Sequence, residues 1–334
     1  MKTAATAPIA TAPGPSGQLD ALAALCKASA DPLRLQVLRV LCKDSFGVSE
    51  LCSLFAIRQP ALSHHLKVLA HAGLVATRRE GNSIFYRRSS LGQRPELEPL
   101  QSRIFECVDR IELPPALARS LARLYRTREE NSRHFFRDNA QKFRQQQDLI
   151  ASYDQYAETV AQMLRDTPLA RRHTALEVGP GDGAFLLELA PLFQRVVALD
   201  NAGLMLDQAR ERARSAGLDN IEFIHGDTAS GELDGIVADC VVINMVLHHT
   251  PAPGRILADV AARLAPDGVV LVTDLCSHDQ GWARENCGDL WLGFDPQELG
   301  RWAREAGLED SASVYLAQRN GFQIQVRLFR RAWQ

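Results

Sequence analysis

The sequence predicts two domains: a small, mainly helical domain that ends in a β-hairpin, followed by a larger α/β domain. Three observations predict this division. The 334 residues are enough for two hydrophobic cores. Before residue 90, short amphipathic helices give way to two strands. From residue 174 onward, apolar strands alternate with helices, which is typical of a parallel sheet covered on both faces.

In the first domain, the helix Gln59–His71 has a polar face suited to reading DNA. It follows the short amphipathic helix Val48–Phe55 and a tight turn, and Gly73 ends it. At about 100° per residue, one face carries Leu62, Leu66 and Leu69. The opposite face carries His64, Lys67 and His71, with Gln59 and Ser63 at its edge. This arrangement fits a helix-turn-helix entering a major groove, although a solvated surface helix would show the same pattern.

A basic hairpin follows that helix. The strand Leu74–Arg79 runs into a turn at residues 80–82, and the strand Ser83–Arg88 returns. Four arginines lie on it: Arg78, Arg79, Arg87 and Arg88. Guanidinium groups on such a hairpin suit DNA phosphates and the minor groove. A helix-turn-helix followed by a basic wing is a winged helix.

The run Gln-Pro-Ala-Leu-Ser-His-His-Leu-Lys-Val-Leu from Gln59 to Leu69, followed by Ala-Gly-Leu-Val, resembles the recognition helix of ArsR-family winged-helix repressors. The resemblance covers about residues 20–110. It implies a homodimer on a roughly palindromic, double-stranded operator. The residues it implies for DNA binding are Gln59, Ser63, His64, Lys67, Arg78, Arg79 and Arg87.

The chain departs from this family where metals bind. Arsenic-sensing members have a Cys-x-Cys pair before the turn, at positions where this chain has Gly47 and Ser49. Cys52 alone supplies too few thiolates for a soft-metal site. Zinc-sensing members use Asp and His on the helix after the wing, and residues 101–112 contain no histidine. We therefore expect no metal site and an input signal elsewhere in the chain.

In the second domain, a glycine string follows the first strand. The predicted strands are 174–178, 195–200, 221–225, 238–244 and 268–275, with residues 264–268 forming the turn into the last one. Gly179, Gly181 and Gly183 precede a helix predicted at 184–190, so a ligand can approach the backbone closely. In such sheets ligands bind at the carboxyl ends of the strands. The glycines alone would also fit a dinucleotide-binding fold.

Polar residues lie within or at the ends of these strands. Glu177 lies in the first strand, Asp200 and Asn244 end the second and fourth, and Asp227 follows the third. Asp200 is placed to accept hydrogen bonds from both hydroxyls of a ribose, and Asp227 is placed to accept one from the amino group of an adenine. Residues 313–318 and 322–328 predict a closing hairpin with a type I′ turn at Asn320-Gly321.

A parallel sheet with these residues and an antiparallel ending resembles the Rossmann-like fold of class I S-adenosylmethionine-dependent methyltransferases, over about residues 150–330. The resemblance implies that Glu177 and the glycines contact the methionine part and the ribose, that Asp200 contacts the ribose and that Asp227 contacts the adenine. Asn244 completes the predicted cofactor site.

Catalysis is less constrained, because methyl transfer mainly requires donor and acceptor to be positioned in line. The catalytic candidates are His248 as a base and Asn244 beside it. Packing of one imidazole of the His248-His249 pair and pocket lining by the other fits the pattern equally well. Tyr153 is a candidate pocket wall or a core residue.

Together the two domains resemble ArsR-type regulators with a methyltransferase-like domain, in some of which S-adenosylhomocysteine is the effector and methionine-cycle genes are the targets. This implies a repressor that binds S-adenosylhomocysteine or S-adenosylmethionine. The alternative is an active S-adenosylmethionine-dependent methyltransferase of unknown acceptor that carries a DNA-binding domain. A redox sensor that binds NAD(H) is a third hypothesis.

Composition and charge support this organisation. We expect a disordered tail at 1–18, the winged-helix and dimerisation domain at 19–110, a helical bridge at 111–150 and the methyltransferase-like domain at 151–330. Residues 1–100 have 12 basic and 7 acidic side chains, net +5, and the remainder has 26 and 33, net −7. The seven cysteines form no CxxC pair, and no apolar run could span a bilayer. The expected location is the cytoplasm.

Overall fold

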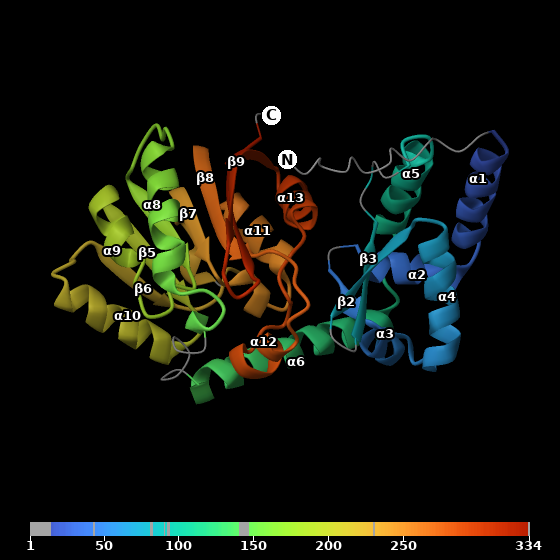
Figure 1. The fold of residues 1–334 in the computed structure, drawn as a ribbon, viewed down its shortest axis with the longest axis horizontal. Coiled ribbons are helices and arrows are strands. Elements are labelled where there is room, and N and C mark those ends of the chain that lie inside the picture. The colour runs from blue at the N-terminus through green and yellow to red at the C-terminus, as the bar shows by residue number, and fades with distance from the viewer. Residues whose placement is uncertain are drawn as a thin grey trace, which may run out of the picture. The chain divides into compact units, whose positions relative to one another are not determined.

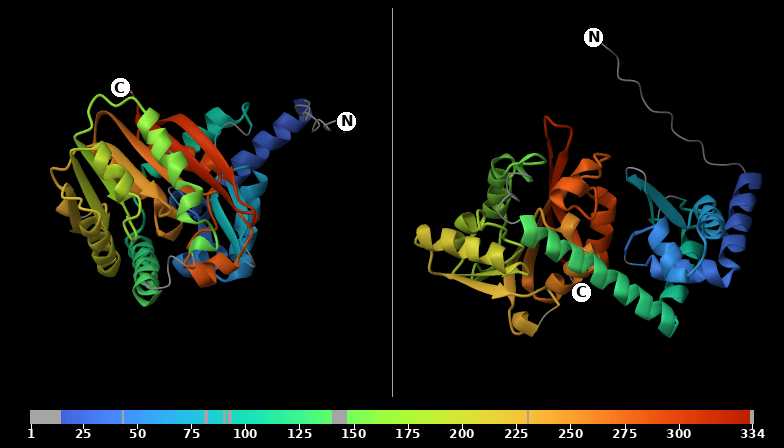
Figure 2. Two further views of the ribbon diagram at one scale, coloured as in Figure 1. Left: turned by 60° about the vertical axis from the view of Figure 1, so that its left-hand side comes forward. Right: turned by 90° about the horizontal axis from the view of Figure 1, so that it is seen from below.

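The computed structural model describes residues 15–42, 44–80, 83–89, 91, 94–139, 147–229 and 231–332. It divides into two compact units (Figures 1 and 2). The first comprises residues up to Arg78 together with Ile84–Leu117, and the second comprises Arg79–Ser83 together with Ala118–Gln334. The tail predicted at 1–18 is too long, because helix α1 already begins at Pro15. The rest of that segment lies outside the described residues.

The first unit is helical, with a small sheet. Its elements are α1 (Pro15–Ser29), α2 (Pro32–Val40), β1 (Phe46–Gly47), α3 (Val48–Phe55), α4 (Gln59–His71), β2 (Val75–Glu80), β3 (Ser83–Arg88) and α5 (Glu98–Asp109). The sheet order is β1-β3-β2, and β1 pairs antiparallel with β3. Periodicity does not predict β1, because two residues are too few to form a pattern. The predicted helix-turn-helix and wing are confirmed.

Local sequence explains how the helices of this unit begin and end. Asp31 caps α2 by accepting a hydrogen bond from the Arg34 amide at 3.0 Å. Ala56 adopts a φ of 53° between α3 and α4, and Gly73 adopts a φ of 74° after α4. Glycine tolerates this left-handed conformation best, so the chain leaves α4 at Gly73. The predicted leucine face of α4 is confirmed, because Leu62, Leu66 and Leu69 are fully buried.

Helix α6 (Pro115–Asn139) is the longest helix in the described part of the chain and contains the boundary between the units. It starts after the predicted break at Pro114-Pro115 and lies within the predicted helical bridge. One side of this helix is apolar and carries Leu117, Leu121 and Leu124, of which Leu117 is buried. No helix among the described residues is both long and apolar enough to cross a membrane.

The second unit is built on a seven-stranded sheet. Its strands are β4 (Thr174–Val178), β5 (Arg195–Asp200), β6 (Ile221–His225), β7 (Ala238–Asn244), β8 (Leu264–Leu275), β9 (Leu308–Ala317) and β10 (Gln323–Arg331). The order is β6-β5-β4-β7-β8-β10-β9. Strands β4 to β8 pair in parallel, whereas β10 pairs antiparallel with β8 and β9. The predicted parallel sheet with an antiparallel ending is confirmed.

Helices cover the sheet of this unit (Figure 1). They are α8 (Ala157–Asp166), α9 (Leu186–Leu189), α10 (Gly203–Ser215), α11 (Pro253–Ala262), α12 (Trp282–Cys287) and α13 (Pro296–Glu305), with 3-10 turns η1 (Tyr153–Gln155), η2 (Ala190–Leu192), η3 (Gly231–Leu233) and η4 (Leu247–His249). The core lies between sheet and helices and includes Val160, Leu186, Val242 and Leu271, all fully buried. The α-helix predicted at 184–190 corresponds to α9 and is shorter than predicted. It begins only at Leu186, and the 3-10 turn η2 follows it from Ala190.

Three details of the predicted sheet are wrong. Residues 264–268 do not form a turn before the fifth strand, because β8 already starts at Leu264. A register shift against β7 and a φ of 63° at Asp267 absorb the irregularity within the strand. The closing strands are longer than predicted. Their connection is not a type I′ turn, because only Gly321 and not Asn320 has a positive φ.

Candidate functional site

The candidate ligand site lies at the carboxyl end of β4, at the centre of the sheet. The strand order of the sheet reverses at β4, which has β5 on one side and β7 on the other. Such a reversal is the switch point where sheets of this kind bind ligands. The strand registers match Glu177 with Ala198 and Val242, and Asn244 with Thr273. Because side chains alternate along strands, Glu177, Asp200, Asn244 and Thr273 share one face of the sheet.

The glycine loop after β4 is held tightly against its neighbours. Gly179, Gly181 and Gly183 all have φ between 57° and 80°. A Cβ on Gly179 would lie 2.5 Å from Val246 Cγ2, and one on Gly183 would lie 2.8 Å from the Cα of Ala209. The backbone of this loop therefore approaches the segment after β7 and helix α10 more closely than any side chain allows. Within the protein, the Gly179 amide donates to the Leu199 carbonyl oxygen at 2.8 Å and the Gly183 amide donates to the Pro180 carbonyl oxygen at 2.9 Å.

Glu177 is the most perturbed carboxyl group of this site. It is 1% exposed, and its Oε2 has no hydrogen-bond partner among the described residues. Burial, together with the nearby carboxylates of Asp182 and Asp200, raises the pKa of Glu177 to about 8. A buried carboxyl group without a partner is costly unless a donor satisfies it. Glu177 is thus suited to receive an ammonium or hydroxyl group of a ligand.

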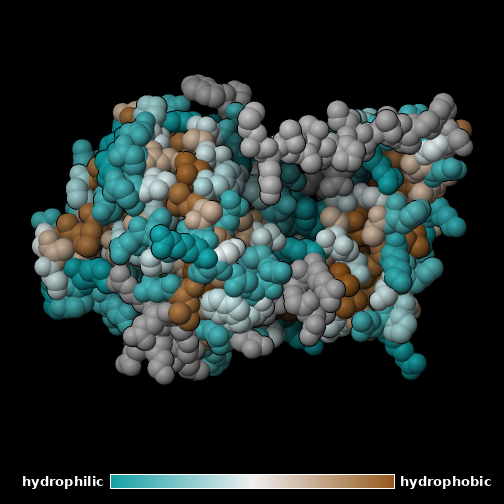
Figure 3. Space-filling model, in the orientation of Figure 1, coloured by the Kyte–Doolittle hydropathy of each residue, from teal (hydrophilic) through white to brown (hydrophobic). Residues whose placement is uncertain are grey.

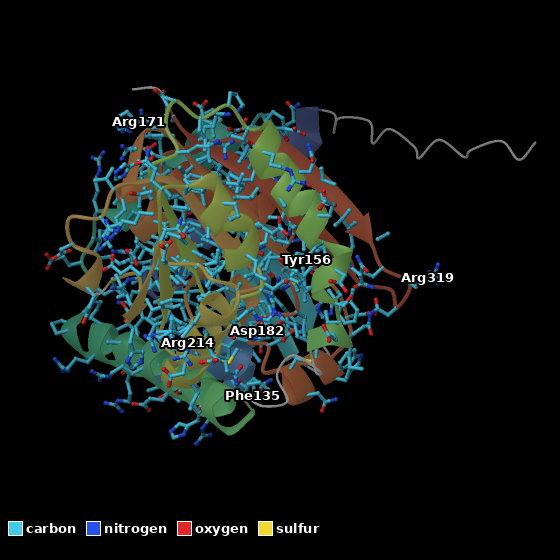
Figure 4. All side chains as sticks on the ribbon, turned by 90° about the vertical axis from the view of Figure 1, so that its left-hand side faces the viewer. Phe135, Tyr156, Arg171, Asp182, Arg214 and Arg319 are labelled. Atoms are coloured by element: carbon cyan, nitrogen blue, oxygen red, sulfur yellow. The ribbon has the colours of Figure 1, made fainter. Side chains whose placement is uncertain are left out.

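Asp182, Arg212 and Tyr153 surround the glycine loop, and the sequence pattern did not single out the first two. Asp182 accepts a hydrogen bond from the Ala184 amide at 3.2 Å and forms an ion pair with Arg212 at 2.7 Å. The Tyr153 hydroxyl donates to the Ala184 carbonyl oxygen at 3.3 Å. Tyr156 and Asp182, labelled in Figure 4, interact electrostatically. In the sequence, the position of Asp182 between two glycines of the loop is the feature that could have identified it as a site residue.

Asp200 and Asp227 both shape turns at strand ends. Asp200 Oδ1 accepts from the Ala202 amide at 2.8 Å, and Asp227 Oδ1 accepts from the Ala229 amide at 2.8 Å. Burial raises the pKa of Asp200 to about 6, although the amides of Ala202 and Asn201 oppose this by stabilising the carboxylate. Each carboxylate thus fixes the turn that follows its strand.

The segment after β7 is strained and polar. Met245 has a φ of 54°, which is uncommon for a residue with a side chain and marks a site where surrounding structure holds the backbone. Asn244 is 9% exposed, and neither amide atom of its side chain has a hydrogen-bond partner among the described residues. The buried Thr273 hydroxyl beside it also lacks one there. Thr273 is a candidate site residue that spacing alone did not reveal.

His248 is clamped rather than open to a substrate. It is 1% exposed, and its Nδ1 lies 2.7 Å from Asp274 Oδ1. Its carbonyl oxygen accepts from the amides of Leu290 and Trp291. Burial lowers its pKa, but the carboxylates of Asp274 and Asp289 outweigh burial and raise the pKa to about 9. His248 is thus buried and held by Asp274, and its role as a base that touches substrate stays a prediction.

His249 is also buried, so neither imidazole lines an open pocket. Donor atoms of His248, His249 and Asp289 lie within 4.8 Å of one another. The separations from Asp289 Oδ1 are 3.9 Å to His248 and 3.7 Å to His249, wider than the roughly 3.3 Å between ligands of a tetrahedral zinc ion. Metal ligation also requires deprotonated imidazoles. We interpret the cluster as an ion-pair clamp that joins η4 to β8 and the loop before Trp291.

The candidate DNA-reading face lies on α4. Gln59, His64 and Lys67 are exposed, and Ser63 is half-buried. His65 lies on the other side, with its Nδ1 3.9 Å from Asp31. In the wing, Arg78 and Arg87 are half-buried, and the side chain of Arg79 lies outside the described residues. The predicted polar helix face is therefore accessible to a groove.

Arg88 is not one of the wing's DNA-facing arginines, contrary to the prediction from the hairpin. It is 6% exposed, donates to the Leu38 carbonyl oxygen at 2.7 Å and pairs with both oxygens of Asp109 at 2.7 and 2.9 Å. Its guanidinium lies 4.6 Å from the centroid of Phe105. Arg88 thus ties the wing to α2 and α5 instead of facing phosphates.

An apolar patch lies on α1 and α5 of the first unit. Its members are Leu19, Leu22 and Leu100, which are 68%, 37% and 37% exposed, and Ile111, just past α5, which is 59% exposed. Figure 3 shows brown, hydrophobic atoms on the visible face of the first unit. Large apolar side chains that stay exposed are typical of surfaces that another protein covers.

Two family models match the chain. "Bacterial regulatory protein, arsR family" matches residues 31–77, and "Methyltransferase domain" matches residues 175–268. The first covers α2 to β2 and the second covers β4 to the bulge in β8. The two matches fall in different compact units.

Relatives divide in the same way. The biofilm growth-associated repressor of Agrobacterium fabrum is 48% identical over 66 residues, 20% of this chain and 56% of the repressor, so the match spans little more than half of that protein. The transcriptional activator HlyU of Vibrio cholerae is 42% identical over 76 residues, 23% of this chain and 70% of HlyU. The uncharacterized methyltransferase YcgJ of Bacillus subtilis is 22% identical over 188 residues, 56% of this chain and 71% of YcgJ.

Among solved structures, the chain is similar to the Burkholderia thailandensis 1,6-didemethyltoxoflavin-N1-methyltransferase with bound 1,6-didemethyltoxoflavin and S-adenosylhomocysteine. The TM-score is 0.49 at 21% identity, over 63% of this chain and 91% of the enzyme. The N-terminal match to HlyU, the two family models and the sheet order of the second unit agree with one another. The chain belongs to the arsR family of bacterial regulatory proteins and carries a class I methyltransferase domain behind its helix-turn-helix.

Proposed function

We propose that this protein is a dimeric DNA-binding regulator, acting as a repressor, whose methyltransferase domain binds S-adenosylhomocysteine or S-adenosylmethionine as an effector. Its targets are genes of the methionine cycle. Glu177, Gly179, Gly181 and Gly183 hold the amino-acid end and ribose of the ligand in this proposal. Asp200 binds the ribose, Asp227 the adenine, and Asn244 completes the site.

The observation that carries the proposal is a set of buried polar atoms at the strand ends. Glu177 Oε2, both amide atoms of Asn244 and the Thr273 hydroxyl have no hydrogen-bond partner among the described residues. Buried polar groups are nearly always paired, because leaving one unpaired costs about 1–3 kcal/mol. A ligand that carries an amino group, a carboxylate and hydroxyls would pair them. An adenosyl amino acid has all three kinds of group.

A second observation favours sensing over base-assisted catalysis. His248 and Asn244 are the catalytic candidates, and His248 is buried, bound to Asp274 and charged at neutral pH. Methyl transfer to an acceptor that needs no base remains open to this site, since such transfer mainly requires alignment. The active methyltransferase is therefore the competing proposal, and turnover separates the two.

DNA binding in this proposal uses Gln59, Ser63, His64 and Lys67 in the major groove and the wing arginines Arg78, Arg79 and Arg87 on phosphates. A ligand alters operator affinity only if it binds the DNA-bound and DNA-free states unequally. Such coupling typically amounts to about 1–3 kcal/mol, or 5–150-fold in affinity. The proposal therefore makes a measurable statement about operator binding.

The test measures affinity for the protein's own promoter at fixed salt, with neither ligand and with each ligand at saturation. We expect at least about a 5-fold change with one ligand. Asp200→Ala should lose this response and keep ligand-free DNA binding, because Asp200 lies far in sequence from the DNA-reading helix. Asp234→Ala, which removes an exposed carboxylate, is the control and should respond like the wild type.

Two results contradict the proposal. Operator affinity that stays constant across saturating levels of both ligands, with binding of at least one confirmed by calorimetry, rules out the sensor. Transfer of a labelled methyl group from S-adenosylmethionine to cell extract components by the purified protein supports the enzyme instead. Loss of DNA binding in Asp200→Ala itself would show that the two units do not act separately.

A further inference from the structure

An unpaired row of arginines lies on the first half of α6. Arg119, Arg123 and Arg126 are exposed, and at 3.6 residues per turn they fall within about 60° of one another. We call these three residues the α6 arginine stripe. The opposite side of the helix carries Leu117, Leu121 and Leu124, so the stripe faces away from the apolar side. In Figure 2, α6 is the long green helix.

The stripe differs from the exposed arginines of α10. There Arg210 pairs with Asp207 and Arg214 with Glu211. Each pair joins residues three apart, as is usual on solvated helices. The stripe arginines form no ion pair or hydrogen bond with any residue that the structure describes. The local sequence explains why the stripe arginines have no such partner, because residues 115–128 contain four arginines and no acidic residue.

We propose that the α6 arginine stripe binds backbone phosphates of the DNA held by the helix-turn-helix, outside the contacts made by α4 and the wing. This rests on the proposed DNA-binding function. The ligand chemistry is the sugar–phosphate backbone of duplex DNA, read without regard to sequence. The stripe supplies three guanidinium groups, which bind phosphates through forked N–H donors.

Three observations favour DNA over an acidic protein as the occupant. Helix α6 starts in the DNA-binding unit, and Arg119 comes two residues after the last residue of that unit. The rest of the chain after residue 100 is acidic, net −7, so a local run of unpaired arginines is not a general property of this part of the chain. The stripe also extends along the helix by about 1.5 Å per residue, which gives a linear array suited to a linear polyanion.

The test measures how DNA affinity depends on salt. The full chain is titrated onto a labelled duplex of mixed sequence, about 40 base pairs or roughly four helical turns long, over a series of salt concentrations. Each phosphate contact contributes about 0.9 to the slope of log affinity against log salt. The triple variant Arg119→Gln, Arg123→Gln, Arg126→Gln should lower that slope by up to about 2.7 per protomer. Affinity at low salt should fall by at least about tenfold.

A matched control separates contact from overall charge. Arg255→Gln, Arg304→Gln and Arg319→Gln together remove the same number of charges from exposed positions elsewhere in the second unit. This control should keep the wild-type slope, because it leaves the α6 arginine stripe intact. A second variant with lysine at the three stripe positions should restore most of the slope, since lysine also binds phosphate as a point charge.

The outcomes are distinct. A lower slope in the stripe variant alone, restored by lysine, supports the proposal. Equal slopes for the stripe variant and the control overturn it and leave the DNA-binding function intact. A wild-type chain that binds neither this duplex nor its promoter overturns the proposed function itself. Because the stripe arginines are exposed, thermal unfolding of all variants should match the wild type, which confirms that the comparison concerns binding.

Discussion

Glu177 illustrates how one buried group can set the chemistry of the candidate ligand site. It sits on β4 at the switch point, where parallel strands bury both faces of the sheet. Burial alone makes its ionised form unfavourable, and Asp182 and Asp200 add to this. The neighbouring glycine loop packs closely, because a Cβ on Gly183 would lie 2.8 Å from the Cα of Ala209. The site thus combines an unpaired carboxyl oxygen with a tightly held glycine loop.

The raised pKa of Glu177 predicts how stability depends on pH without ligand. Its folded pKa is about 8, against an ordinary value of 4.5. A group with a raised folded pKa stabilises the fold fully below the unfolded pKa, and this contribution is lost as pH rises through the folded pKa. The free energy of unfolding should therefore fall between about pH 4.5 and 8, by at most about 1.4 kcal/mol per pH unit.

Glu177→Gln removes this titration, so its free energy of unfolding relative to wild type should rise with pH over the same range. Urea unfolding at about pH 6, 7 and 8 measures the difference. Glu309→Gln, at an exposed position on β9, is the control and should keep the wild-type profile. Parallel profiles for wild type and Glu177→Gln would show that Glu177 is ionised throughout, contrary to this reasoning.

At the scale of elements, the wing depends on one arginine for its attachment to helices. Arg88 ends β3 and reaches α2 through the Leu38 carbonyl oxygen and α5 through Asp109. It also lies over the Phe105 ring. These contacts join residues that are 21 and 50 positions from Arg88 in the chain. We therefore expect the wing and α5 to move together, because separating them would expose the buried Arg88 side chain to water.

Arg88→Ala should lower the free energy of unfolding by about 1–3 kcal/mol, because it removes charge-assisted hydrogen bonds and leaves a buried carbonyl oxygen with one partner fewer. Arg103→Ala is the matched control on α5. Arg103 pairs with Glu106 at 2.7 Å, but both side chains are exposed, so its loss should cost no more than about 0.5 kcal/mol. Chemical unfolding of both variants measures this, and equal losses would contradict the proposed link between wing and helix.

For the whole molecule, the apolar patch on α1 and α5 predicts the oligomeric state. Leu19, Leu22, Leu100 and Ile111 expose large apolar surfaces that a second copy would cover. A dimer would place two recognition helices on a palindromic operator, as helix-turn-helix proteins generally do. We therefore predict that the proposed homodimer buries these side chains.

We expect the wild-type chain to sediment as a dimer and the double variant Leu22→Glu, Leu100→Glu as a monomer. Losing the burial of one leucine costs about 1.5–3 kcal/mol, so dimer affinity should fall by at least about 100-fold. Leu204→Glu and Val237→Glu together, at exposed positions of the second unit, provide the control. Sedimentation velocity distinguishes these outcomes. A dimer that survives in the patch variant places the interface elsewhere.

The sequence alone determined the features that depend on local spacing. Period-two and period-3.6 apolar patterns predicted the helix-turn-helix, the wing and five parallel strands, and the glycine string with Glu177, Asp200 and Asn244 marked the strand ends. These follow from which residues one helix face or one strand can bury, so neighbours along the chain suffice.

Only the tertiary structure decided which partners distant residues find. Asp109 removes Arg88 from the DNA-facing set, and His248 lies buried between Asp274 and Asp289. Asp182 pairs with Arg212, and Asn244 lies beside Thr273 without a partner in the described chain. Each of these contacts joins residues about 20 to 40 positions apart. Burial and pairing across such distances depend on the packed fold, and no local pattern encodes them.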